Sequence, residues 1–460
     1  MPDYIKNSER GISSAFLDSI TRKHGKIYLV GGPVRDKLLG QAPPKDLDFI
    51  VCGIDIDKLV KLLKRHGDVN LVGQTFGVIK FKPHDSGEVI DLSLPRRELS
   101  TGSGHRDFKI DFDPNLPIET DLGRRDFTIN AMAIEFPDGE LLDPFGGRAD
   151  LENKILRMVS ERSFPEDPLR ILRGIQFAAR FGLSVEEKTQ ASMARNAGLI
   201  KSVSPERITE ELNKLLEKAY TPSKGFHLML ETGLLETILP ELAQTIGVDQ
   251  PGGYHRWDVF EHTLHVIDEA PASLVVRLAA LFHDVGKPQT RQLIENGATF
   301  YGHDKLGRAM AEKAMKRLKY SNEIIGKVSL LIDKHMFSEK AGEKGIRRLI
   351  NKIGTDLIFD LIALRKADTV AQGMGQTTES IGEFELKVRD ELTKSRAFGL
   401  KDLALNGNDL MQHFDLKEGP MVGQVLNFLM EKVLDQPELN TAEQLTALAG
   451  EFLTKSDLDI

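Results

Sequence analysis

The sequence predicts an α+β fold in which a small mixed sheet comes first and helices form the rest. From Lys26 to about Asp143, short β-rich runs such as IYLV, DFIV, VIKF and EVIDL alternate with turn residues. From about Leu151 onward, amphipathic segments with helical spacing replace them, as in RILRGIQFAARFG and ERITEELNKLLEKAY. The segment TIGVDQPGGYHRW, rich in glycine, proline and polar residues, separates two blocks of helices.

These changes in pattern divide the 460-residue chain into four parts. A chain of this length with 40% hydrophobic residues can bury several cores. We expect one α+β part followed by three helical parts, at residues 25–150, 151–220, 221–375 and 376–460.

The amino-acid composition indicates the cellular compartment in which the protein works. The N-terminal segment has no apolar run after its charges, and no stretch approaches the roughly 18 apolar residues of a membrane helix. The single cysteine, Cys52, excludes an intrachain disulfide and a cysteine-based zinc site. Cys52 lies in the apolar run FIVCG and is expected in the core rather than as a nucleophile. We therefore expect a cytoplasmic protein without a membrane partner.

The net charge of −8 argues against a protein that coats nucleic acid through a general basic field. An RNA substrate would need a local basic face. Three clusters of basic residues could supply it, although solvated helix faces explain most of them. For the last cluster given below, a solvated helix face and an RNA-binding face explain the pattern equally well. The basic clusters are Arg124 and Arg125, then Arg170, Arg173 and Arg180, then Lys305, Arg308, Lys313, Lys316, Arg317 and Lys319.

A glycine turn and a pair of aspartates carry the first chemical signal. IYLV runs into GGPVRDKLLG, where Gly31 and Gly32 let backbone N–H groups approach a phosphate. In KDLDFIV, Asp46 and Asp48 are two residues apart, so both carboxylates face one side of a strand. Such a pair repels unless a metal or a basic partner compensates, and two bound ions about 4 Å apart would support nucleotidyl transfer. Asp91, in VIDLS, is either a third carboxylate or an ordinary sheet residue.

The segment SFPEDPLRILRGIQFAARFG predicts a helix with two different faces. Pro168 suits the first turn and Asp167 the cap before it. One stripe is polar and the other is apolar enough to pack. The polar stripe holds Asp167, Arg170, Arg173 and Phe177, and the apolar stripe holds Leu169, Leu172 and Ile175 or Gln176.

Asp167 and Arg170 are open to two interpretations. They could form a simple ion pair between neighbouring helical turns. Alternatively, they could read a base, because cytosine and adenine both present an amino donor beside a ring-nitrogen acceptor, and uracil and guanine present the reverse. A carboxylate beside a guanidinium complements only the first two bases. Asp167 and Arg170 would then select CTP and ATP.

Histidines and aspartates gather in the second half of the chain. A His-Asp pair closes the apolar segment LAALF just before Gly286 and Pro288, where a buried imidazole and carboxylate need partners. Imidazole and carboxylate ligands together suit Mn, Ni, Fe or Zn. The residues concerned are His262, His283, Asp284, His303, His335 and Asp368.

Four ordered motifs resemble the class II transfer RNA nucleotidyltransferases and the related bacterial poly(A) polymerases: GGPVRDKLLG, DLDF, RRDFTINAMA and EDPLRILRGIQFAARFG. The predicted helical segments after Leu151 and the closing segment NGNDLMQHFDLKEGPMVGQVL also resemble the neck, body and tail domains of that family. The resemblance implies a polymerase β-like head in which Asp46 and Asp48 are catalytic and bind Mg²⁺. It also implies transfer RNA, CTP and ATP as partners. The residues that it assigns to nucleotide binding are Gly31, Gly32, Arg35, Arg125, Asp126, Glu166, Asp167, Arg170 and Arg173.

The group of histidines and aspartates in the second half of the chain resembles the metal site of the HD phosphohydrolase domain. Some nucleotidyltransferases of this kind keep an active HD domain with phosphatase or cyclic phosphodiesterase activity, and others keep only its helices. Both outcomes stay open for this sequence. By this resemblance a divalent metal would bind His262, His283, Asp284 and Asp368, while His303 and His335 could join a second ion or contact phosphate.

The leading hypothesis is an enzyme that adds C, C and then A to transfer RNA 3′ ends without a nucleic-acid template. Addition of A only, of CC only or of poly(A) remains open. The segment RRELSTGSGHRDFKIDFDPNLPIE is where the family's loop for switching from C to A would lie. A metal phosphohydrolase with a regulatory nucleotide-sensing head is the alternative of another class, and intact Asp46 and Asp48 argue against it. A non-catalytic RNA-binding protein is weaker still. The sequence does not indicate an oligomeric state.

Overall fold

The computed structural model describes residues 15–42, 47–72, 77–84, 88–100, 108–136, 139–253, 256–295, 297–394 and 397–456. The chain separates into two compact units, Met1–Ile238 and Leu239–Ile460, and each is described by itself. In the described ranges, no helix is long and apolar enough to cross a membrane. The division into four parts remains a prediction.

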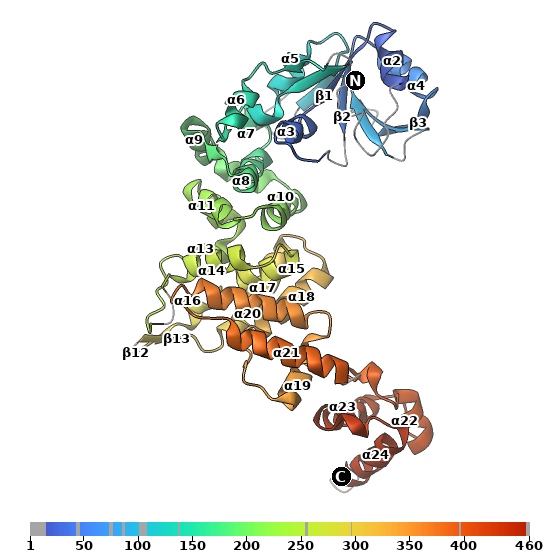
Figure 1. Cartoon of the computed structure of the whole chain (residues 1–460), viewed down its shortest axis with the longest axis vertical. Coiled ribbons are helices and arrows are strands. Elements are labelled where there is room, and N and C mark those ends of the chain that lie inside the picture. Colours follow the sequence, from blue (N-terminus) through green and yellow to red (C-terminus); the bar gives the residue numbers. More distant parts are fainter. Residues whose placement is uncertain are drawn as a thin grey trace. The chain divides into compact units, whose positions relative to one another are not determined.

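The first unit is built on a mixed sheet (Figure 1). Among the described residues, seven strands hydrogen-bond in the order β3-β4-β5-β2-β1-β8-β9. Strands β2 and β5 run parallel, and the other neighbours run antiparallel. The predicted small mixed sheet is therefore confirmed. The strands are β1 (Lys26–Val30), β2 (Asp48–Cys52), β3 (Gly67–Val72), β4 (Val78–Pro83), β5 (Ile90–Ser93), β8 (Ala133–Phe136) and β9 (Leu141–Leu142). A separate hairpin pairs β6 (Arg96–Ser100) with β7 (Phe108–Phe112).

Both faces of this sheet are covered, which explains why IYLV and DFIV are continuous apolar runs rather than alternating ones. Leu29 and Phe49 pack on one face with Phe16 of α2 (Ala15–Thr21) and Leu59 of α4 (Ile56–Leu63). Tyr28 and Ile50 pack on the other face with Leu122 of α5 (Ile118–Gly123). The short helix α3 (Gly32–Leu38) follows β1 directly.

Helices complete the first unit, with one departure from the all-helical expectation. Strands β10 (Ile155–Leu156) and β11 (Ser184–Val185) form a parallel pair of two residues each. A pairing this short is carried by backbone hydrogen bonds and has no side-chain period that a sequence pattern could reveal. The helices are α6 (Gly147–Glu152), α7 (Ser163–Glu166), α8 (Leu169–Phe181), α9 (Glu187–Asn196), α10 (Pro205–Lys218), α11 (Ser223–Glu231) and α12 (Leu235–Ile238).

In its described residues, the second unit is helical apart from the hairpin of β12 (Gln292–Ile294) and β13 (Gly297–Thr299). Helix α15 (Leu274–Phe282) reads LVVRLAALF and is buried almost all round, since it contacts α14, α18 and α20. The other helices are α13 (Pro240–Ala243), α14 (Val259–Glu269), α16 (Lys287–Thr290), α17 (His303–Arg317), α18 (Asn322–Lys334), α19 (Glu343–Ile353), α20 (Ile358–Ala371) and α21 (Glu379–Lys394).

The last three helices of the second unit have a hydrophobic core of their own. They are α22 (Gly407–Phe414), α23 (Pro420–Asp435) and α24 (Ala442–Ser456). Leu410, Leu429 and Leu445 contribute one fully buried side chain from each helix.

Candidate nucleotide site and histidine–aspartate cluster

The glycine turn lies between β1 and α3 in the first unit. Gly31 has φ +73° and ψ −133°, a conformation that only glycine adopts without strain. A Cβ atom at this position would lie 2.6 Å from Nη1 of Arg125. The turn therefore requires glycine on two counts, because its backbone is in a glycine-only region and an arginine lies directly against it.

Asp48 is the first residue of β2, and its side chain is exposed at the end of the sheet. Its partner in the register with β5 is Asp91, whose Oδ1 lies 3.3 Å from Nζ of Lys80. Asp46 lies outside the described residues. Asp91 thus lies on the strand beside Asp48, as a third carboxylate would, but it is not among the residues that line the cavity described next. The geometry of the predicted aspartate pair stays a prediction.

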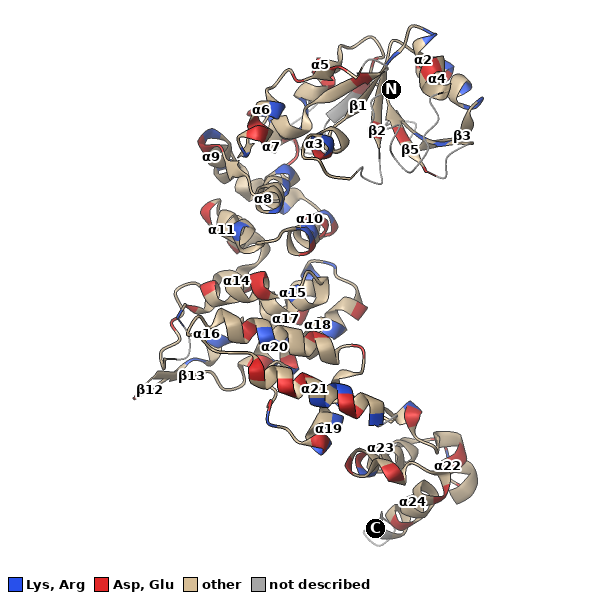
Figure 2. Ribbon diagram, in the orientation of Figure 1, with Lys and Arg blue, Asp and Glu red and all other residues tan. Residues whose placement is uncertain are grey.

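A cavity of about 290 Å³ opens beside Asp48 and the glycine turn. Six arginines and three aspartates line it, so positive charge is in excess, as a polyphosphate would require. Figure 2 shows basic residues on α8 and α10, two helices that contribute to this lining. The lining residues are Gly31, Gly32, Asp48, Arg96, Arg124, Arg125, Asp126, Asn130, Asp167, Leu169, Arg170, Arg173 and Arg207.

One buried carboxylate holds two of these arginines. Asp121, on α5, is 0% exposed and accepts hydrogen bonds from Nε and Nη2 of Arg124 at 3.0 and 2.7 Å. Its other oxygen accepts from Nη2 of Arg125 at 3.4 Å. Burial lowers the pKa of Arg125, although the neighbouring carboxylate of Asp121 opposes that shift. The two guanidinium groups are therefore held in place before any ligand binds.

Asp167 precedes α8, but the cap differs by one residue from the prediction. Helix α8 begins at Leu169 with Pro168 as its N-cap residue, and Asp167, one position earlier, accepts a hydrogen bond from the first backbone N–H of the helix. Oδ1 of Asp167 accepts from the backbone N of Leu169 at 3.2 Å, and Oδ2 accepts from Nη2 of Arg207 at 2.7 Å. The carboxylate is therefore fixed on both oxygens.

Arg170 is held differently, by Glu166 at 3.6 Å and by the carbonyl of Ser163 at 3.3 Å. Among the described contacts, the simple ion pair between Asp167 and Arg170 does not occur. Both side chains line the cavity. Leu169, Leu172, Ile175 and Gln176 of the predicted packing stripe of α8 are all buried. Phe177, which was predicted on the opposite stripe, is buried as well, so the buried face of the helix is wider than predicted.

Two predicted nucleotide-binding residues, Arg35 and Glu166, are not among the residues that line the cavity. Arg35 is 5% exposed. Its guanidinium group lies 5.1 and 4.6 Å from the ring centroids of Phe177 and Phe181, both on α8. Arg35 therefore contacts α8, and Glu166 contacts Arg170.

Sequence reasoning did not assign Arg96, Asn130, Asp121 or Arg207 to a site. Asp121 and Asn130 flank the RRDF motif, so a search around that motif could have included them. Arg207 belongs to the ordinary amphipathic pattern of α10, and no local signal distinguishes it. The predicted basic group on α17 is partly paired, since Arg308 contacts Glu312 and Arg317 contacts Glu241.

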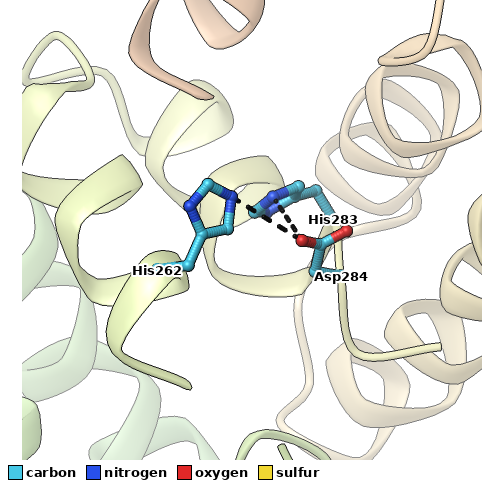
Figure 3. Close-up of side chains that lie close together, drawn as sticks. All are labelled: His262, His283 and Asp284. Carbon is cyan, nitrogen blue, oxygen red and sulfur yellow. Dashed lines mark ion pairs between the residues drawn. The ribbon is translucent and has the colours of Figure 1, made fainter. Parts of the chain in front are cut away.

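The second unit brings the predicted histidines and aspartates together. Two groups could each hold an ion, and they share Asp284: His262, His283 and Asp284, and then Asp284, His303 and His335. Figure 3 shows His262 and His283 meeting at the carboxylate of Asp284, with Nε2 to Oδ2 distances of 3.7 and 3.1 Å. Asp368 joins them, because its Oδ1 lies 3.0 Å from Nε2 of His262.

Three of these rings are anchored in the same way. Nδ1 of His283, His303 and His335 lies 2.7–2.8 Å from the carbonyl oxygen three residues earlier. A carbonyl only accepts, so Nδ1 carries the hydrogen and Nε2 points inward as the coordinating atom. Nε2 of His303 and Nε2 of His335 face each other at 3.2 Å.

Charges in this cluster favour a cation. Burial alone would lower the pKa of His283, but Asp284 raises it above the ordinary value. Burial would raise the pKa of Asp284, yet His283 and Lys287 hold it well below its usual range. Nε2 of His283 and Oδ2 of Asp284 are buried and face each other at 3.1 Å, and Nζ of Lys287 lies 2.5 Å from the same Oδ2. These atoms fit a divalent metal, and a cavity of about 500 Å³ beside them admits a ligand.

Three family models match parts of the chain. The "Poly A polymerase head domain" matches residues 27–157, the "Probable RNA and SrmB- binding site of polymerase A" matches residues 182–246, and "tRNA nucleotidyltransferase domain 2" matches residues 299–449.

Curated relatives extend over most of the chain. The multifunctional CCA protein of Nitrosococcus oceani is 42% identical over 300 residues, which cover 64% of this chain and 70% of the relative. The multifunctional CCA protein of Xanthomonas campestris pv. campestris is 34% identical over 418 residues, which cover 87% and 96%.

Solved structures share the fold. The CCA-adding enzyme of Bacillus stearothermophilus, in complex with CTP, has a TM-score of 0.72 at 21% identity, with 100% of both chains covered. The CCA-adding enzyme of Thermotoga maritima, in complex with transfer RNA, has a TM-score of 0.56 at 20% identity, with 98% of both chains covered.

The mixed-sheet head, its arginine-lined cavity and these matches define an enzyme of the nucleotidyltransferase class with a poly(A) polymerase head. Enzymes of this class use a divalent metal. The chain belongs to the family of CCA-adding enzymes whose curated members are called multifunctional CCA proteins. The resemblance carried by the four sequence motifs is thereby confirmed.

Proposed function

We propose that this chain adds C, C and A to the 3′ end of transfer RNA, from CTP and ATP, and releases pyrophosphate. The observation that carries the proposal is a single cavity that is lined by Asp48, by six arginines and by Asp167. Acidic metal ligands, phosphate-binding groups and a base-reading carboxylate are the three parts that this reaction needs. Its relatives named multifunctional CCA proteins support the same product.

The residues have separate roles in this proposal. Asp46 and Asp48 hold Mg²⁺, which when bound neutralises phosphate charge and lowers the barrier to nucleotidyl transfer. The turn at Gly31 and Gly32, with Arg125 against it, binds the triphosphate. Asp126 and Arg173, which lie 3.1 Å apart, line the space between phosphates and base.

Base choice rests on Asp167 and Arg170. Asp167 accepts from the amino group of cytosine or adenine, and Arg170 donates to the neighbouring ring nitrogen. Glu166 assists by holding Arg170 at 3.6 Å. Because these groups belong to the protein, no nucleic-acid template is required. Transfer RNA would be bound by shape and phosphate contacts along the helical parts, and a cytoplasmic location stays a prediction.

A primer-extension assay tests this function. Purified protein is incubated with transfer RNA that lacks its final A, CA or CCA, together with labelled CTP or ATP. We expect extension to CCA and a stop at that point. Unlimited addition of A would instead indicate a poly(A) polymerase, and addition of only A or only CC would indicate a partial enzyme. An Asp48→Asn variant is the control, and an active control would exclude the metal role of Asp48.

The histidine–aspartate cluster supports a second activity, metal-dependent hydrolysis of a phosphate ester. His262, His283, Asp284 and Asp368 would bind the first ion, and His303 and His335 the second, with Mn, Ni, Fe or Zn as candidates. Lys287, with Nζ 2.5 Å from Oδ2 of Asp284, and Arg365 line the adjacent cavity and can contact phosphate.

The test of the second activity compares wild type with His283→Ala. Hydrolysis of a cyclic nucleotide or a phosphate monoester by metal-loaded protein should be lost in the variant, while CCA addition is kept. Metal content after dialysis is measured in parallel and should fall. Hydrolysis that persists at the wild-type rate would exclude this cluster as the hydrolytic site.

A further inference from the structure

Asn130 lies at the end of a short 3₁₀ helix, Thr128–Asn130, and is 4% exposed. Its side-chain oxygen accepts from Nη1 of Arg35 at 2.7 Å. Its side-chain nitrogen donates to Oδ1 of Asp126 at 3.0 Å. A neutral amide can accept from an arginine through its oxygen and donate to a carboxylate through its nitrogen at the same time.

Arg35 and Asp126, the two hydrogen-bond partners of Asn130, both contact α8. Arg35 comes from α3, directly after the glycine turn, and its guanidinium group lies against the rings of Phe177 and Phe181. Asp126 pairs with Arg173 of α8 through Oδ2, at 3.1 Å. Asn130 therefore joins two connections that run from the glycine turn and from the RRDF motif to one helix.

We infer that Asn130 is a positioning residue that fixes the distance between the glycine turn and the base-reading end of α8. The inference rests on the proposed function, in which the turn binds the triphosphate and α8 reads the base. A nucleotide spans a set distance between phosphates and base edge, so CTP and ATP are selected only when the two protein elements are held at that distance. Asn130 contributes to nucleotide choice in this way without touching the base.

The geometry also indicates how the amide differs from its closest replacements. Asn130→Leu keeps the approximate volume and removes both hydrogen bonds. Among the described contacts, Arg35 then keeps only its bonds to Asp36, and Asp126 keeps only the backbone N of Phe127 and its pair with Arg173. Asn130→Asp keeps the acceptor for Arg35 but places a carboxylate against that of Asp126. Both variants should loosen α8 relative to the glycine turn.

The experiment measures kcat and KM separately for CTP and for UTP, with transfer RNA that lacks CCA as primer. We expect the preference for CTP over UTP, as the ratio of kcat/KM values, to fall at least about tenfold in Asn130→Leu and in Asn130→Asp. Thermal unfolding shows whether each variant is folded at the assay temperature, and Asn130→Asp serves if Asn130→Leu is not.

A matched control is Gln176→Leu. Gln176 is a buried amide on α8 itself, is 1% exposed, and neither of its amide atoms has a hydrogen-bond partner in the described structure. It should keep the wild-type preference. An equal loss of preference in Gln176→Leu would show that any change in this helix has the same effect, and the inference would fail.

A double-mutant cycle with Arg173→Met tests the connection itself. If Asn130 acts through Asp126 and Arg173, Asn130→Leu should lower the preference much less in the Arg173→Met background than in wild type. Fully additive effects would overturn the inference. A wild-type protein that incorporates no nucleotide rejects the proposed function, whereas an active wild type whose preference survives both Asn130 variants rejects this inference alone.

Discussion

Arg207, on α10, donates from Nη2 to Oδ2 of Asp167 over 2.7 Å. The two residues are 40 positions apart in the sequence. The orientation of the proposed base-reading carboxylate is thus set partly by a different helix and only partly by its own turn, where Leu169 N donates to Oδ1.

Arg207→Met should weaken base choice without unfolding the protein. Loss of one of two anchors leaves Asp167 held only by the backbone N of Leu169, so misincorporation of UMP should rise about three- to tenfold relative to CMP. Arg207 is half exposed, so the free energy of unfolding should change by less than about 1 kcal/mol. The matched control is Arg195→Met, which breaks an exposed pair with Glu161 at 3.1 Å. Equal misincorporation in both variants would contradict the role of Arg207.

Asp167→Ala should relax base choice more than it harms metal binding. The variant loses the acceptor for the amino group of cytosine and adenine, but Asp48 is untouched. We expect incorporation of UMP and GMP to become measurable, while the Mg²⁺ concentration for half-maximal rate stays within about twofold of the wild-type value. A variant that still rejects UTP and GTP as strictly as the wild type would remove Asp167 from base reading.

Gly31→Ala should lower activity strongly. The backbone conformation costs a residue with a side chain about 1–3 kcal/mol, and the new Cβ would lie 2.6 Å from Nη1 of Arg125. Because Arg125 must then move, kcat/KM for CTP should fall at least about tenfold. Gly40→Ala has a similar φ of +68° but nothing within 4 Å of the new Cβ. It should lose stability and keep activity, which separates strain from displacement of Arg125.

Cys52 should be slow to react with thiol reagents in the folded protein. Burial, with the carboxylates of Asp121 and Glu119, raises the pKa of this thiol from 9.0 to about 12. At pH 8 the thiolate fraction, and with it the labelling rate, should be about a thousandfold below that of a free cysteine. The rate should keep rising through pH 10, where a free thiol has levelled off. Denaturant should remove the difference, and rapid labelling of native protein at pH 8 would contradict this account.

Local motifs predicted those parts of the site that depend on neighbours in sequence. Gly31 was predicted from the turn that follows the strand IYLV, and Asp48 was predicted from the aspartate pair at the start of the next strand. The structure places both residues at one cavity. The buried stripe of α8 follows from helical periodicity in the same way. These features need only the local backbone geometry, which a sequence pattern reports.

Features that depend on packing were not predictable in this way. Arg35 was assigned from its motif, but the direction of its side chain depends on where Phe177 and Phe181 lie. Arg207 and Asn130 acquire their partners only when distant segments meet. The hairpin of β12 and β13 was missed because its strands have three residues each, although Asn-Gly at 296–297 is a common hairpin signal.

The identical anchoring of His283, His303 and His335 on backbone carbonyls has a kinetic consequence. An ion arriving at this cluster would meet three rings that are already turned inward, so these rings would not have to rotate to bind it. Its rate of entry would then be limited by the exchange of its own hydration water. Ions that exchange water quickly would load first, and a slowly exchanging ion such as Ni²⁺ would be retained once it had entered.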